Sequence, residues 1–138
     1  MALRRLVFPL QRRGELTREE FQRYWRDEHA PLVRRHARTM GIRRYVQVHT
    51  DVNAETDPGR AARGGAPPHD GVAELWIDTE LAEGTIEERR AAAAELLADE
   101  RKFIDLEASP FFYGSERTIV DELGWTAAEA DEAGADAR

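Results

Sequence analysis

Apolar and polar positions follow strand spacing in four segments and helix spacing in two longer ones. The strands are predicted at residues 3–10, 44–50, 72–78 and 111–120, and the middle two alternate between apolar and polar side chains. The longer helices are predicted to begin at Thr17 and at Thr85, the second running to about Phe103 through a stretch rich in Ala, Leu, Glu and Arg.

The first helix carries start and stop signals. Thr17 can cap free backbone amides, and Glu20 three residues later completes a capping box. Pro31 disfavours helical backbone at the residue before it, so this helix is predicted to end near His29. Pro31 can itself begin a short second helix, for which Gly41 is a natural C-terminal stop.

The order β-α-β-β-α-β is that of the ferredoxin-like α+β fold, a four-stranded antiparallel sheet with helices on one face. Strand alternation predicts an amphipathic, aromatic-bearing set of side chains on the other, open face: Tyr45, Gln47, His49, Glu74 and Trp76. An exposed face of this kind commonly marks a site that binds another molecule. We therefore expect two copies to pack sheet against sheet as a homodimer, a dimeric α/β barrel.

Two segments lie outside this pattern. Residues 51–71 are rich in Gly, Pro and Asp, and we predict a long, mobile loop that is either a lid or simple disorder. Residues 121–138 are acidic and rich in Ala, and we predict a disordered tail in which only Trp125 has the character to dock. Residues 1–120 form the one predicted domain.

Composition narrows the class of protein. The chain of 138 residues is 41% hydrophobic and 34% charged, which is typical of a globular domain. It has no cysteine, which excludes disulfides and thiolate chemistry.

The net charge is −7, although residues 1–44 are basic. Those arginines are dispersed among acids without an aromatic platform, which argues against nucleic acid. No apolar run has the length of a membrane span. We expect a cytoplasmic protein with neither nucleic acid nor membrane as partner.

The segment from residue 16 to residue 33 resembles a motif of the EthD-domain family, F-x-x-Y-W-x-x-x-H-x-P. The matching residues are Phe21, Tyr24, Trp25, His29 and Pro31, and the stretches at 71–78 and 98–106 also resemble that family. The resemblance covers about residues 3–120. It implies the dimeric α/β-barrel fold and a chemistry like that of dehydratases, cyclases or decarboxylases of aromatic polyketides, without a cofactor.

His29 is the first candidate for catalysis, because an imidazole can take and return a proton near neutral pH. Its predicted place at a helix C-terminus favours the charged form, whereas the aromatic stripe with Phe21 and Trp25 favours the neutral one. The alternative is that His29 only caps the helix. Tyr24, Trp25 and Phe21 are predicted to contact substrate, with core packing as the alternative.

His49 and Trp76 complete the predicted substrate-binding set. On strand alternation both lie at the open face, whereas His29 faces the space between helix and sheet, so no dyad of His29 and His49 is predicted. His36 has no third ligand near it, so no metal site is predicted. Asp99, Glu100 and Asp105 look like surface charges at the end of a helix.

The function hypothesis is a homodimeric, cofactor-independent enzyme that performs a dehydration or cyclisation on a hydrophobic aromatic molecule. One alternative is a non-catalytic dimer that binds the same kind of molecule. Others are a cofactor-free monooxygenase and, last, haem degradation with His29 or His49 as axial ligand. Fold alone does not choose among them.

Overall fold

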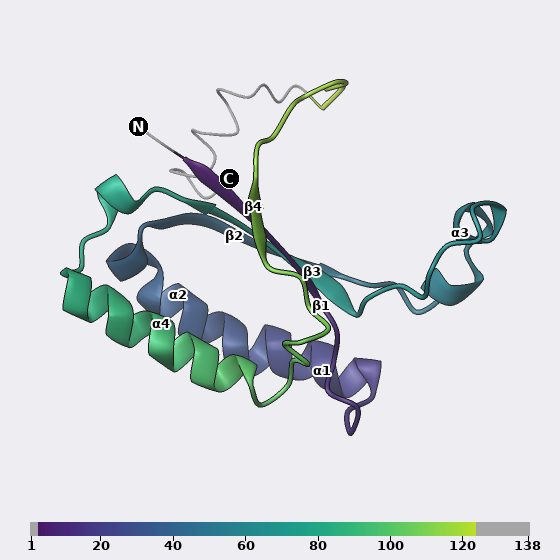
Figure 1. Cartoon of the computed structure of the whole chain (residues 1–138), viewed down its shortest axis with the longest axis horizontal. Coiled ribbons are helices and arrows are strands. Elements are labelled where there is room, and N and C mark those ends of the chain that lie inside the picture. The colour runs from purple at the N-terminus through teal and green to yellow at the C-terminus, as the bar shows by residue number, and fades with distance from the viewer. Residues whose placement is uncertain (1–2, 124–138) are drawn as a thin grey trace.

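A four-stranded antiparallel sheet with its helices on one face organises the computed structural model, which describes residues 3–123 (Figure 1). The strands, in the sheet order β2-β3-β1-β4, are β1 (Arg4–Leu10), β2 (Ile42–His49), β3 (Gly71–Ile77) and β4 (Phe112–Gly114). The main helices are α1 (Arg18–Tyr24), α2 (Ala30–Met40) and α4 (Ile86–Glu100). This confirms the predicted ferredoxin-like α+β fold. The predicted tail falls mostly on residues 124–138, which lie outside the described part.

The helix starts follow the predicted capping signals. The Thr17 hydroxyl accepts the Glu20 N–H at 3.1 Å, and the Glu20 carboxylate accepts the Thr17 N–H at 2.9 Å. Thr85 and Glu88 form a second capping box at the start of α4. Gly41 ends α2 with φ of +77°, and a Cβ at this position would overlap the Asp78 carbonyl.

The predicted assignment of the β2 side chains to the two sheet faces is wrong. Tyr45 pairs with Leu75 and Gln47 with Ala73, so Tyr45, Gln47 and His49 share the face covered by the helices. The valines of β2 occupy the open face instead. A tyrosine ring buries more apolar surface than a valine, and its hydroxyl here finds hydrogen-bond partners under the helices.

The last strand and the long loop also differ from prediction. β4 pairs with β1 over only three residues, because Gly114 is followed by a polar, exposed segment without alternation. Residues 51–70 contain a 3₁₀ turn (Ala54–Thr56) and α3 (Pro58–Ala62), which extend from the β2–β3 hairpin as an arm (Figure 1). Asp70 holds the base of this arm, because its buried carboxylate accepts the Arg12 amide at 2.8 Å and the Arg18 Nε at 3.0 Å.

The core lies between the sheet and the helices. Its buried members are Phe8, Leu10, Phe21, Trp25, Ala73, Phe103 and Ile104. Within residues 3–123, none of the helices has the length and apolar character needed to cross a membrane.

Candidate active site

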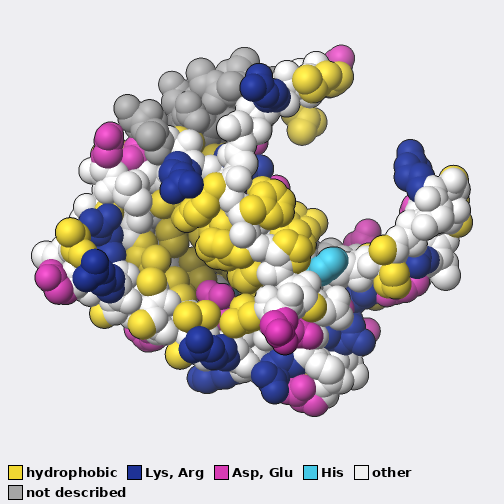
Figure 2. All heavy atoms as spheres, viewed as in Figure 1, with side chains coloured by type: hydrophobic (Ala, Val, Ile, Leu, Met, Phe, Trp, Pro, Cys, Tyr) yellow, Lys and Arg dark blue, Asp and Glu magenta, His cyan; other side chains and the backbone are white. Residues whose placement is uncertain are grey.

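An apolar cavity of about 310 Å³ lies between the sheet and helices α2 and α4. Aliphatic and aromatic side chains from all four strands and both helices form most of its wall, and hydrophobic side chains gather around a hollow on this side of the molecule (Figure 2). His29, Glu100 and the phenol of Tyr45 interrupt the apolar lining. A few polar groups in an apolar recess are typical of a small-molecule site.

His29 reaches the cavity from one turn of π-helix, Trp25–His29, which joins α1 to α2. The predicted helix end near His29 is wrong, because the backbone stays helical through Pro31. A proline cannot donate to the carbonyl four residues back, and its ring would collide with that carbonyl in a regular α-helix. The wider turn, in which the Ala30 N–H donates to the Trp25 carbonyl, accommodates it. His29 thus lies within the helix, and the dipole of a helix end does not act on it.

A carboxylate from α4 orients the His29 ring. Nδ1 of His29 lies 2.7 Å from Oδ2 of Asp99, and the Tyr24 hydroxyl donates to Oδ1 of Asp99 at 2.6 Å. An ionised carboxylate only accepts hydrogen bonds, so the proton of the neutral imidazole is on Nδ1. The lone pair of Nε2 is then available to take a proton. Nucleophiles and bases in enzymes are commonly oriented by a third group in this way.

Burial sets the charge of this pair. Desolvation lowers the pKa of His29 below its usual 6.5, and the neighbouring Asp99 only partly opposes this. For Asp99, burial raises the pKa, but the hydrogen bonds from Tyr24 and His29 outweigh burial and the pKa is lowered. At neutral pH the imidazole is therefore neutral and the carboxylate is ionised.

Glu100 supplies an acid in the same cavity. Burial, and secondarily the charge of Asp99, raise the pKa of Glu100 to about 7. A large fraction of this side chain is therefore protonated at neutral pH, unlike an ordinary glutamate. The cavity thus contains both a base and an acid near neutrality, an arrangement that favours proton-transfer chemistry.

The Tyr45 hydroxyl can still donate one hydrogen bond. Its oxygen accepts the Trp25 Nε1–H at 3.1 Å and the Gln47 Nε2–H at 3.0 Å. A phenol oxygen has two acceptor positions and one proton, so the O–H remains to donate. Burial raises the pKa of Tyr45 to about 12, and the two hydrogen bonds oppose this only in part. The phenol therefore keeps its proton at neutral pH.

The other predicted site residues are distributed unevenly. Trp25 lines the cavity, whereas Tyr24 is linked to it only through Asp99 and then His29. Phe21 is fully buried in the core. His49 stacks on Trp25, with ring centroids 4.6 Å apart, and borders a separate hollow toward the arm.

Trp76 lies on the opposite, open face of the sheet, away from the cavity. The guanidinium groups of Arg5 and Arg44 lie 3.9 Å and 4.5 Å from its ring centroid. The Glu74 carboxylate lies 3.3 Å from the Arg5 guanidinium. This face therefore contributes nothing to the wall around His29.

Sequence reasoning missed the roles of Asp99, Glu100 and Tyr45. A signal for Asp99 was present: Ala92, Leu96, Asp99 and Phe103 follow helical spacing, and all four are buried. A carboxylate within an apolar stripe needs a partner. No comparable signal exists for Glu100, which lies at the edge of that stripe.

Comparisons with known proteins agree with this fold. The family model described as the EthD domain matches residues 13–107. Among solved structures, the chain is similar to an EthD family protein from Bacillus halodurans, with a TM-score of 0.52 and 21% identity. That likeness covers 84% of this chain and 100% of the other. None of the curated proteins matches this chain.

Proposed function

The chain belongs to the EthD family, and from this premise we propose that it is a cofactor-independent enzyme that moves protons on a hydrophobic, aromatic small molecule. The observation that carries the proposal is the buried His29–Asp99 pair at the wall of an apolar cavity. Titratable groups whose pKa values are shifted by burial and a charged partner are frequent at functional sites.

In this proposal His29 is the general base. Nε2 takes a proton from the substrate, and Asp99 stabilises the imidazolium that forms. Tyr24 is a positioning residue, because its hydroxyl holds the Asp99 carboxylate. Trp25 contacts the substrate as an aromatic wall, and Tyr45 donates its free O–H to a substrate oxygen.

Glu100 is the general acid, which makes a dehydration the reaction that best suits the cavity. His29 takes a proton from a carbon, the electrons of that C–H bond form a double bond, and the neighbouring hydroxyl leaves with the Glu100 proton as water. Solvent then carries the proton from His29 back to Glu100. A cyclisation that ends in loss of water uses the same two groups.

We further propose that two copies pack through the open sheet face. Val48 and Phe112 remain 48% and 49% exposed there. A second copy would cover these half-exposed apolar side chains, because the centre of a dimer interface is apolar.

A ligand screen read by mass spectrometry tests the function. Phenols and anthraquinone-like polyketides are added to the full chain, and a compound that binds the native state raises the melting temperature. We expect at least one aromatic compound both to stabilise the protein and to return with the mass of water lost. A stabilising compound that always returns unchanged would support the non-catalytic binding dimer instead.

A further inference from the structure

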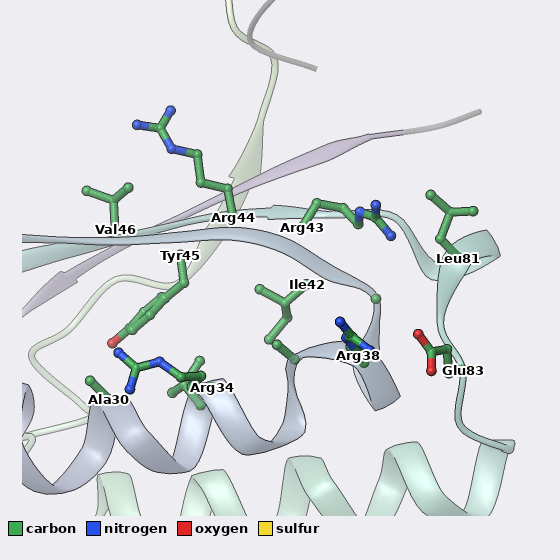
Figure 3. Close-up of a pocket in the computed structure, with 13 residues that line it drawn as sticks. Ala30, Arg34, Arg38, Ile42, Arg43, Arg44, Tyr45, Val46, Leu81 and Glu83 are labelled. Carbon is green, nitrogen blue, oxygen red and sulfur yellow. The ribbon is translucent and has the colours of Figure 1, made fainter. Parts of the chain in front are cut away.

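An arginine-lined groove of about 660 Å³ lies beside the cavity, between α2 and the edge strand β2 (Figure 3). Arg34 and Arg38 come from α2, and Arg43 and Arg44 from β2. Figure 3 shows Arg34 and Arg38 below the strand, on the side of Tyr45, whereas Arg44 extends from its other side. One acidic side chain, Glu83, lines the groove at the end near Leu81.

The groove and the apolar cavity adjoin. Val33, Ile42 and Tyr45 line both. The Tyr45 ring therefore faces the cavity while the arginine groove lies directly beside it. A molecule whose ring occupies the cavity can extend a substituent into the groove along this shared wall.

Three of the arginines that line the groove lack an ionic partner among the described residues. Within residues 3–123, Arg34, Arg38 and Arg43 have no ion pair or side-chain hydrogen bond, whereas the adjacent Arg35 pairs with Glu95 at 2.7 Å. Arg34 and Arg38 are four residues apart on one helix face, where like charges repel. A charged side chain on an edge strand can keep that strand from pairing with another chain, which explains an arginine on β2. It does not explain two arginines on the facing helix.

We propose that this groove binds the anionic group, a carboxylate or a phosphate, of the molecule whose aromatic part occupies the cavity. The planar guanidinium groups of Arg34 and Arg38 suit either oxyanion. The inference rests on the proposed function for its use of the cavity, and it defines the substrate class as an aromatic acid or aryl phosphate.

Binding of three matched probes tests the inference on the full chain. The probes share one ring system: 2-naphthoate, 2-naphthyl phosphate and the neutral methyl 2-naphthoate. By calorimetry at low salt we expect at least one anion to bind about 10-fold or more tightly than the ester, and this advantage to shrink at high salt. The tighter of the two anions identifies the oxyanion.

The double variant R34Q/R38Q provides the structural test, with R35Q as the matched control on the same helix. We expect R34Q/R38Q to lose the advantage of the anion and to keep affinity for the ester, and R35Q to behave as wild type. Equal binding of ester and anions by wild type, or equal behaviour of R34Q/R38Q and R35Q, would overturn the inference while leaving the cavity proposal intact.

Two further outcomes separate this inference from others. If none of the three probes binds, the cavity proposal fails and the inference fails with it. If the naphthyl anions do not bind but a single-stranded oligonucleotide binds and loses affinity in R34Q/R38Q, the groove is a nucleic-acid surface and the inference is wrong.

Discussion

The two faces of the sheet differ in whether an ionisable side chain has an ionic partner. On the open face, the Arg5 guanidinium pairs with Glu74 and lies over the Trp76 ring. On the helix face, Glu100 lies in an apolar wall without an ion pair among the described residues, and burial raises its pKa to about 7. Ion pairs keep charge in place, whereas unpaired burial makes a proton easy to move at neutral pH.

Within the described part of the chain, the two buried tryptophans also differ between the faces. Trp25 donates to Tyr45 and is 1% exposed, within a closed network under the helices. Trp76 is 5% exposed, yet its Nε1 has no acceptor among the described residues. Hydrogen bonds therefore hold the Trp25 ring on the helix face, whereas the guanidinium groups of Arg5 and Arg44 hold the Trp76 ring on the open face.

The largest expected effect is on turnover and concerns the helix face. His29→Ala should lower turnover of a confirmed substrate about 100- to 10,000-fold, because the general base is lost. Asp99→Asn should also lower it, because the imidazole loses the carboxylate that orients it. Steady-state kinetics measures both.

His36→Ala is the matched control, since His36 pairs with Glu95 at 2.8 Å, and neither lines the cavity. It should leave turnover unchanged. Wild-type activity in the His29→Ala variant would remove His29 from the mechanism.

The next effect is on stability. Trp25→Ala should lower the free energy of unfolding by about 3–5 kcal/mol, because a large buried ring is replaced by a void. Val48→Ala, a half-exposed position on the open face, should cost about 1 kcal/mol or less. Denaturant unfolding compares the two variants, and similar losses would show that the faces are packed alike.

A smaller effect depends on pH. The folded pKa of Glu100 lies above its unfolded value of 4.5, so folding binds a proton and stability falls as pH rises toward 7. Glu100→Gln avoids this loss, so its melting temperature relative to wild type should rise by a few degrees between about pH 5 and pH 8. A difference that stays constant over this range would mean that Glu100 titrates normally.

The smallest effect on the cavity is expected from the open face itself. Val48→Asp introduces a charge into the proposed interface and should convert a dimer into a monomer. Turnover per chain should stay close to wild type, because Val48 does not line the cavity. Light scattering measures the mass in solution, and a variant that remains dimeric would place the interface elsewhere.

Local signals in the sequence predicted the elements, and long-range contacts decided the site. The capping box at Thr17 and the stripe ending at His29 depend on neighbours within one helix, so both could be inferred. The partner of His29 is 70 residues away, and only the packing of α4 against the π-helical turn brings it there. Tyr45 was assigned to the wrong face because alternation defines two faces without saying which one the helices cover.

The Pro31 region shows a different limit. The rule that a residue before proline leaves the helical region is local, and it predicted a break after His29. Packing of α1 and α2 along one sheet keeps the helix continuous, and the π-turn absorbs the proline. Tertiary structure thereby placed His29 in the wall of the cavity instead of at a helix end.

The central claim is that His29 is a neutral base whose free nitrogen meets ligands in the apolar cavity. A ¹⁵N NMR titration of the histidine rings, with and without methyl 2-naphthoate, tests it most directly. We predict that His29 keeps its proton on Nδ1, gains charge only below its usual pKa of 6.5, and shifts at Nε2 when the ester is added, whereas His36 does not respond. A His29 that becomes charged at or above that pKa, or that is unaffected by the ester, would contradict the account.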